Sequence, residues 1–168
     1  SGDPGSGASK RNGGMIGSGH RVGLAMLEKR YGRERGVAVL KEGMKALAFT
    51  TGFIEAEGID CNFRRCGRFR GAWTPGAYET MAGDLETPSQ LIGLEAVMVP
   101  KDEVQKEVAT GKYHGGCIFL QHGGLHPGLF HQGLMDRAEA AGARVIGQTP
   151  VTGLEKDGQR FRLATPRG

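Results

Sequence analysis

Between Glu34 and Glu57 the sequence carries one apolar stripe that a long helix would present along a single side. Steps of three and four residues, the spacing of one helix face, join the members of the stripe. They are Val37, Leu40, Met44, Leu47, Thr51 and Ile54. Gly43 and Gly52 each weaken a helix by roughly 1 kcal/mol relative to alanine, so we expect close packing at both. Gly58 predicts the end of the helix, and we interpret the stripe as core.

The remaining elements are shorter and predict an α+β fold with a mostly antiparallel sheet. Residues 1–19 are expected to form a loop. Thr74 as N-cap, Pro75 and Pro127 at first helical positions and Gly142 as a stop delimit two of the expected helices. Helices are expected over 22–31, 75–86, 101–108 and 126–142, the last with Leu134, Ala138 and Ala141 on its inner face. Strands are expected near Phe63 and over 69–73, 93–100, 115–121, 143–147, 150–155 and 160–165, with a hairpin turn at 156–158.

Composition excludes several classes of protein. Glycine supplies 30 of 168 residues but follows no three-residue period, which excludes a collagen-like chain. No apolar run reaches the length of a membrane-spanning helix. The net charge is +4, yet basic and acidic residues are interspersed, so we do not expect nucleic-acid binding, which would require a steep salt dependence. Cys61, Cys66 and Cys117 lack metal-ligand spacing and suggest reduced thiols in a cytoplasmic protein.

The segment GSGASKRNGG, residues 5–14, has the composition of a phosphate cradle. A P-loop requires Lys-Ser after its last glycine, whereas Ala8 and Ser9 follow Gly7. A dinucleotide-binding GxGxxG fingerprint requires glycine where Lys10 stands, and it must follow a strand. Two interpretations stay open from the residues alone: an anion-binding nest of backbone amides and a disordered terminus.

The histidines do not predict a metal site. His122 and His126 have the HxxxH spacing, but Gly123, Gly124 and Pro127 disfavour the continuous helix that a zinc pair needs. No GxSxG elbow supports a serine hydrolase.

GSGASKRNGG resembles the second flavin-binding segment of D-amino-acid-oxidase-type FAD-dependent oxidoreductases. It is most similar to the γ-glutamylputrescine-oxidoreductase-like branch, although that branch commonly has glycine where Lys10 stands. Further similar segments follow in order along nearly the whole chain. They are EKRYGRERG, GIDCNFRRCGRFRGAWTP, KYHGGCIFLQHGGLHPGLFHQGL and AAGARVIGQTPVTGLE.

The resemblance implies that the chain is an internal piece of a larger enzyme with FAD as cofactor. The implied domains are an FAD-domain remnant over 1–58, part of the substrate domain over 59–125, and a return to the FAD domain over 126–168. The implied activity is oxidation of a primary or secondary amine or amino acid to an imine by hydride transfer to flavin. The isolated chain is expected to be inactive, to bind FAD weakly or not at all, and to self-associate through exposed sheet edges.

The resemblance also implies roles for individual residues. Gly7, Ala8 and Ser9 are expected near the FAD pyrophosphate. Arg11, Asn12, Gly13 and Gly14 are expected near the ribityl chain and the edge of the flavin ring. Val151 matches a position whose backbone meets the adenine.

On the substrate side, Tyr113 and His114 match a strand that lines the substrate cavity. The alternative for His114 is a surface histidine at a strand end, and Gly115 and Gly116 suggest a close approach of the backbone to a ligand. No catalytic residue and no metal ligand is implied. A non-catalytic protein-interaction module derived from the same fold is the alternative function.

Overall fold

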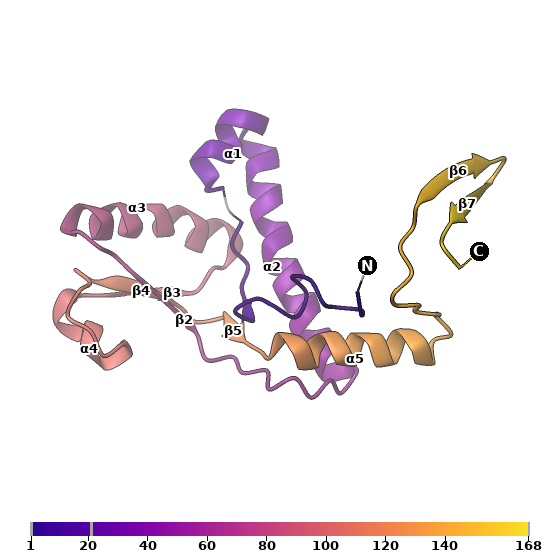
Figure 1. Cartoon of the computed structure of the whole chain (residues 1–168). Coiled ribbons are helices and arrows are strands. Elements are labelled where there is room, and N and C mark those ends of the chain that lie inside the picture. Colours follow the sequence, from indigo (N-terminus) through magenta and orange to yellow (C-terminus); the bar gives the residue numbers. More distant parts are fainter. Residues whose placement is uncertain (1, 21, 168) are drawn as a thin grey trace. The chain divides into compact units, whose positions relative to one another are not determined.

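The computed structural model describes residues 2–20 and 22–167, and the chain divides into two compact units. The first unit contains residues 2–13, 59–61 and 126–167, and the second contains Gly14–Gly58 and Asn62–Leu125. Within the described residues every strand pair is antiparallel, and helices and strands are mixed along the chain (Figure 1), so the predicted α+β class is confirmed.

The second unit contains two adjacent helices, α1 (Leu24–Tyr31) and α2 (Arg33–Ala56), which lie side by side (Figure 1). The predicted stripe on α2 is confirmed, because Leu40, Leu47, Thr51 and Ile54 are buried. Two glycines, Gly36 and Gly43, complete the buried face. The helix stops as predicted at a glycine in the left-handed region, Gly58, with φ of 58°.

A three-stranded sheet forms the rest of the second unit, in the order β2 (Arg68–Gly71), β4 (Gly116–Phe119), β3 (Ala96–Val99). Helix α3 (Pro75–Ile92) contacts the sheet. A small core is made by Ala72, Met81, Cys117 and Phe119, with Tyr78, Leu85, Leu94, Ala96 and Met98 packed against it.

The start of α3 is as predicted, but its end is not. The Thr74 hydroxyl accepts a hydrogen bond from the Ala77 N–H at 3.1 Å, and Pro75 occupies the first turn. The helix continues past the predicted end near Glu86, through Pro88, and stops before Gly93, whose φ is 67°. Propensity disfavours an internal proline, which removes one backbone donor. Leu85 and Leu94 both pack on the core, so tertiary contacts outweigh this local loss.

Short elements complete the second unit. Strand β1 (Met15–Ile16) pairs with β5 (Gly123–Gly124), and neither strand was predicted. Residues 1–19 were expected to form a loop, and the diglycine of β5 carries no alternation of apolar and polar side chains. The strand expected near Phe63 is reduced to a single bridge between Arg64 and Gly124. The helix expected over 101–108 is present in two pieces, η1 (Lys101–Glu103) and α4 (Val104–Glu107).

The first unit contains α5 (Pro127–Ala140) and the hairpin β6 (Gly153–Asp157) and β7 (Arg160–Ala164). The predicted inner face of α5 is wrong at two of its three residues: Leu134 and Ala141 are exposed, whereas Ala138 is half-buried and Gly133 is buried against Ile59. The hairpin turn is confirmed at Gly158, with φ of 61°. Residues 143–147 form no strand, because within the described chain they pair with no neighbouring strand.

Candidate functional site

The predicted phosphate-contacting segment folds as a series of turns that its own side chains stabilise. Gly5 has φ of 76°, a left-handed value that favours glycine. The N–H of Ser6 donates to the carbonyl of Asp3 at 3.0 Å. The side-chain amide of Asn12 donates to the carbonyls of Ala8 and Ser9 at 3.0 and 3.3 Å. The segment therefore has the geometry of a series of turns held by local hydrogen bonds.

Exposed residues occupy the middle of this segment. Within residues 2–20 and 22–167, no hydrogen bond uses the N–H groups of Gly7, Ala8 or Ser9, and all three residues are exposed. A Cβ atom placed on Gly7 or Gly13 would meet no other atom within 4 Å. Neighbouring free N–H groups on an open turn suit an anion with several acceptor oxygens.

Lys10 and His131 lie against the back of the same turn. A Cβ on Gly5 would come within 2.5 Å of the Lys10 Cε and 2.6 Å of the His131 ring. Helix α5 carries His131, so the helix and the turn belong to one packed arrangement. Lys10, the departure from the family pattern, therefore packs beside Gly5.

Val151 lies at the start of the hairpin in the same unit and is exposed. Nearby in sequence, Gln148 donates from its backbone N–H to the Gly2 carbonyl at 3.4 Å and from its side chain to Asp3 at 3.0 Å. The first unit thus brings the opening turn and the segment that leads to Val151 into contact.

Gly14, the last residue of the predicted flavin-contacting segment, lies in the second unit. It is buried with φ of 65°, and its carbonyl accepts a hydrogen bond from the Leu125 N–H at 2.9 Å. Of the predicted flavin-contacting residues, Gly7 to Gly13 and Val151 are in the first unit, whereas Gly14 shares the second unit with Tyr113 and His114.

Tyr113 belongs to an aromatic cluster at one end of the sheet. Its ring makes edge contacts with Trp73 and Phe69, at centroid distances of 4.8 and 5.9 Å. The ring lies over Gly71, where a Cβ would approach it to 2.5 Å. Trp73 is 64% exposed, so the cluster combines a packed base with an open aromatic surface. Sequence reasoning did not single out Phe69 and Trp73 as site residues, although both lie at the ends of the strand predicted over 69–73.

His114 is half-buried and extends the pairing of β2 with β4. Its N–H donates to the Ala72 carbonyl at 2.8 Å, and the Ala72 N–H donates to the Gly115 carbonyl at 2.9 Å. The backbone at His114 is therefore fixed by the sheet.

Gly115 and Gly116 do approach other groups closely, but those groups belong to this chain. A Cβ on Gly115 would lie 2.4 Å from the Tyr78 ring, and one on Gly116 would lie 2.6 Å from the Phe69 ring. The expectation of a ligand at these glycines is replaced by internal aromatic packing.

The two histidines of the HxxxH pair have separate environments. His122 lies between β4 and β5, whereas His126 caps α5 by accepting a hydrogen bond from the Leu129 N–H at 3.2 Å. Among the described residues, no group of three or more His, Cys, Asp or Glu side chains could hold a metal ion. No described helix combines the length and apolarity needed to cross a membrane.

The amino-acid sequence matches a known protein family across the whole chain. The model of the FAD dependent oxidoreductase family, DAO, matches residues 1–168. The chain belongs to this family. The opening turn and the sheet with Tyr113 thus occur in an FAD dependent oxidoreductase domain.

The relatives that this chain resembles are longer. The chain is 27% identical to the probable oxidoreductase OrdL of Rhizobium meliloti over 165 residues, which cover 98% of this chain and 38% of that protein. It is 24% identical to the gamma-glutamylputrescine oxidoreductase of Escherichia coli over 151 residues, covering 90% of this chain and 35% of that protein. The chain therefore spans little more than a third of these relatives.

A solved structure shows the same fold. Glycine oxidase from Geobacillus kaustophilus aligns with a TM-score of 0.66 and 24% identity, covering 98% of this chain and 43% of that one.

Proposed function

We propose that this chain supplies the flavin-contacting segment and the substrate-side sheet of an FAD-dependent enzyme that oxidises an amine or an amino acid to an imine. The observation that carries the proposal is the exposed turn at Gly7, Ala8 and Ser9, whose N–H groups are available to an anion. This turn lies within a chain that matches the family over its whole length.

We assign the residues of the opening turn to the phosphates of FAD. Gly7, Ala8 and Ser9 would hold the pyrophosphate through backbone N–H groups and the Ser9 hydroxyl. Arg11, Asn12, Gly13 and Gly14 would approach the ribityl chain and the ring edge, and Val151 would meet the adenine. The Asn12 amide supports this assignment because it already orders the turn from inside, through the carbonyls of Ala8 and Ser9.

Tyr113 and His114 would contact the substrate. Trp73 supports this role for Tyr113, because the exposed indole extends the aromatic surface that an amine-bearing molecule can contact. When bound, FAD would accept a hydride from the C–H bond next to the substrate nitrogen. The chain's own share is to hold the substrate at the sheet end, where hydrogen bonds of the β2–β4 pairing fix the backbone of His114.

Activity is proposed for the full-length protein only, with domain boundaries near residues 58 and 125. The chain alone is proposed to be inactive, since the relatives that it matches are more than twice as long. The three free thiols support a cytoplasmic location.

FAD titration of the full-length protein, followed by its visible absorption, tests the cofactor site. Gly7→Asp places a negative charge in the open turn and is expected to weaken FAD binding about tenfold or more, which is roughly 1.4 kcal/mol. Gly111→Asp is the matched control, because Gly111 is also exposed with open space around it. Equal affinities of the two variants would contradict the assignment, and a wild-type protein without flavin binding would favour the interaction module.

Anaerobic flavin reduction by a panel of amines and amino acids tests the substrate class. Tyr113→Ala is expected to raise the substrate concentration needed for half-maximal reduction, because the aromatic surface is lost. Tyr113→Phe keeps that surface and is expected to retain most of the affinity. A panel without any reducing amine or amino acid would contradict the proposed reaction.

A further inference from the structure

His122 is a buried histidine that packs against the loop of residues 15–20. This loop follows the flavin-contacting segment, residues 5–14. His122 is 2% exposed and stacks on Phe119 with a centroid distance of 4.9 Å and an interplanar angle of 12°. Its other neighbour is Gly17, where a Cβ would lie 2.6 Å from the ring Nδ1. The imidazole therefore fills the space between the sheet and the loop.

The hydrogen bonds of His122 define its protonation state. Its Nε2 accepts a hydrogen bond from the Ser18 backbone N–H at 3.2 Å, and the Ser18 hydroxyl lies 3.1 Å from the same nitrogen. Because a backbone N–H can only donate, Nε2 carries no proton, and the proton of the neutral ring is on Nδ1. Within the described chain, Nδ1 is buried and has no hydrogen-bond partner.

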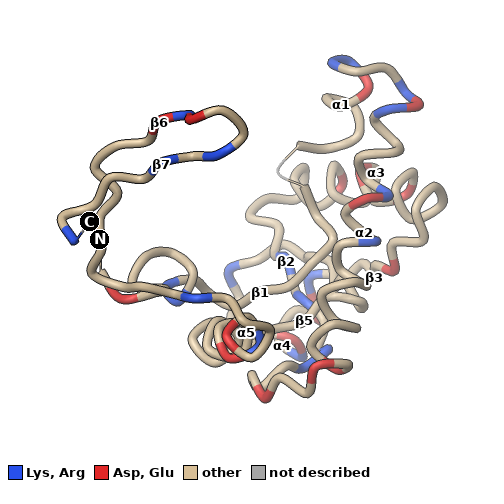
Figure 2. Tube along the Cα trace, turned by 90° about the vertical axis from the view of Figure 1, so that its right-hand side faces the viewer, with Lys and Arg blue, Asp and Glu red and all other residues tan. Residues whose placement is uncertain are grey.

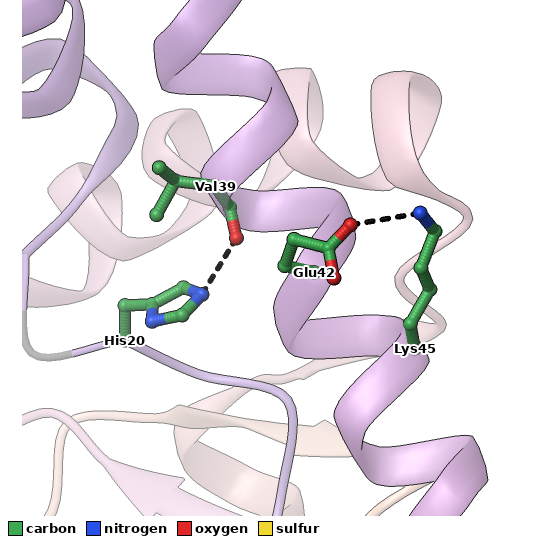
Figure 3. Close-up of polar contacts among 4 residues, drawn as sticks. All are labelled: His20, Val39, Glu42 and Lys45. Carbon is green, nitrogen blue, oxygen red and sulfur yellow. Dashed lines mark hydrogen bonds and ion pairs between the residues drawn. The ribbon is translucent and has the colours of Figure 1, made fainter. Parts of the chain in front are cut away.

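The charged surroundings favour the same neutral form. Burial, and to a smaller extent the guanidinium of Arg68 on β2, lower the pKa of His122 below its ordinary value of 6.5. The titratable side chain that the loop itself presents in the described residues is His20, and its Nε2 is engaged elsewhere, donating to the Val39 carbonyl at 2.7 Å (Figure 3).

The loop has further attachments besides His122. Residues Met15 and Ile16 pair with Gly124 and Gly123, and the Ser18 carbonyl packs on α2 at Gly43. His20 adds the bond to Val39 that Figure 3 shows. Ser18 lies between these attachments. Among these contacts, its hydrogen bond to His122 is the one that protonation of the imidazole would break.

We propose that His122 is a positioning residue for the loop of residues 15–20: its neutral imidazole holds Ser18 and so fixes the chain that leads back to Gly14, the last residue of the flavin-contacting segment, and protonation of the ring releases it. The cofactor part of this inference rests on the proposed function, whereas the proton-dependent hold on the loop does not.

The direction with pH follows from the lowered pKa. Above about pH 6.5 the ring is neutral in both the folded and the unfolded chain, and the contribution of His122 to stability is complete. Below that pH the unfolded chain takes up the proton first, so the folded state loses stability as pH falls. Protonated Nε2 can no longer accept the Ser18 N–H.

Hydrogen exchange of the full-length protein without FAD tests the hold on the loop directly. We expect the Ser18 amide to be protected at pH 7.5 and, after correction for intrinsic rates, to lose protection below pH 6.5. His122→Phe keeps the stacked ring without the acceptor, and it is expected to speed Ser18 exchange at pH 7.5 about fivefold to tenfold, the effect of one lost hydrogen bond. His122→Gln offers an acceptor that does not titrate, and it is expected to retain protection at both pH values.

His126→Asn is the matched control, because asparagine preserves the helix cap and the variant also removes one imidazole. Its Ser18 exchange is expected to equal that of the wild type. Ser18 exchange that is unchanged in His122→Phe, or a pH response that persists in His122→Gln, would overturn the proposal.

FAD affinity measured at pH 5.5 and 7.5 tests the cofactor part of the proposal. We expect wild-type affinity to fall at the lower pH and His122→Gln to reduce that fall. A wild-type protein without FAD binding would defeat the proposed function while leaving the exchange result to decide the role of His122. FAD affinity equally pH-dependent in the wild type and His122→Gln would overturn the positioning of Gly14 for FAD.

Discussion

Gly115 shows at the scale of one residue how a sequence feature acquires its meaning from the fold. Its φ of 123° is a backbone conformation that residues with a side chain rarely adopt. The Tyr78 ring and the Val99 carbonyl occupy the space that a Cβ would fill. In the sequence, two adjacent glycines in a predicted substrate strand indicate that another group approaches the backbone closely. Which group makes the approach depends on Tyr78 of α3, some forty positions away in the chain.

Gly115→Ala is expected to destabilise the protein by about 2 kcal/mol or more, because positive φ and overpacking each contribute roughly 1–3 kcal/mol. Urea unfolding followed by circular dichroism measures the change. Gly111→Ala is the control, since Gly111 has open space and no positive φ, and it is expected to change stability by less than about 1 kcal/mol. Similar midpoints for the two variants would show that the Tyr78 ring yields easily.

The two glycines of α2 show the same distinction at the scale of an element. From the sequence, Gly43 and Gly52 both weaken the same helix, and close packing was expected at each. In the structure, a Cβ on Gly43 would clash with the Ser18 carbonyl, whereas one on Gly52 would meet nothing within 4 Å. Only Gly43 has the close packing that was expected for both.

Gly52→Ala is expected to stabilise the protein by up to about 1 kcal/mol, because alanine is the better helix former and no neighbour opposes it. Gly43→Ala gains the same propensity but must displace the loop backbone, so we expect a net loss of roughly 1–2 kcal/mol. Thermal unfolding of the two variants beside the wild type checks the opposite signs. Stabilisation by both substitutions would mean that the loop is not packed on α2 at Ser18.

At the scale of the whole molecule, the hairpin of β6 and β7 has two chemically different faces. Residues opposite each other across an antiparallel pair share a face, so Leu154, Leu163 and Phe161 lie together, with Lys156 opposite Phe161. Each of the three apolar side chains is more than half exposed. The other face carries Glu155, Arg162, Asp157 and Arg160, and Figure 2 shows the mixed charges along this hairpin. An exposed apolar face on a two-stranded unit favours association with another surface.

Self-association of the isolated chain is therefore expected, and sedimentation velocity over micromolar concentrations measures it. Leu163→Lys is expected to weaken the association by removing apolar area and adding like charge to the face. Glu155→Gln changes the net charge by the same amount on the opposite face and is expected to have little effect. A chain that stays monomeric at high micromolar concentration would contradict the prediction.

Local chemistry was sufficient to predict several features of this protein from its sequence. The apolar spacing of α2, the Thr74-Pro75 start of α3 and the turn at Gly158 depend on neighbouring residues, so they were readable without the fold. The order of motifs likewise indicated the FAD dependent oxidoreductase family, which the match over the whole chain confirms.

Other features required the tertiary structure, because they depend on residues that are distant in sequence. Helix α3 passes Pro88 because its core contacts outweigh a local penalty, and residues 143–147 form no strand because a strand needs a partner. The roles of Gly115 and His122 have the same origin. Gly115 lies against the ring of Tyr78. His122 accepts a hydrogen bond from Ser18, which is 104 positions away in the chain. Spacing along the chain describes faces and turns, whereas burial and hydrogen-bond partners exist only once distant segments meet.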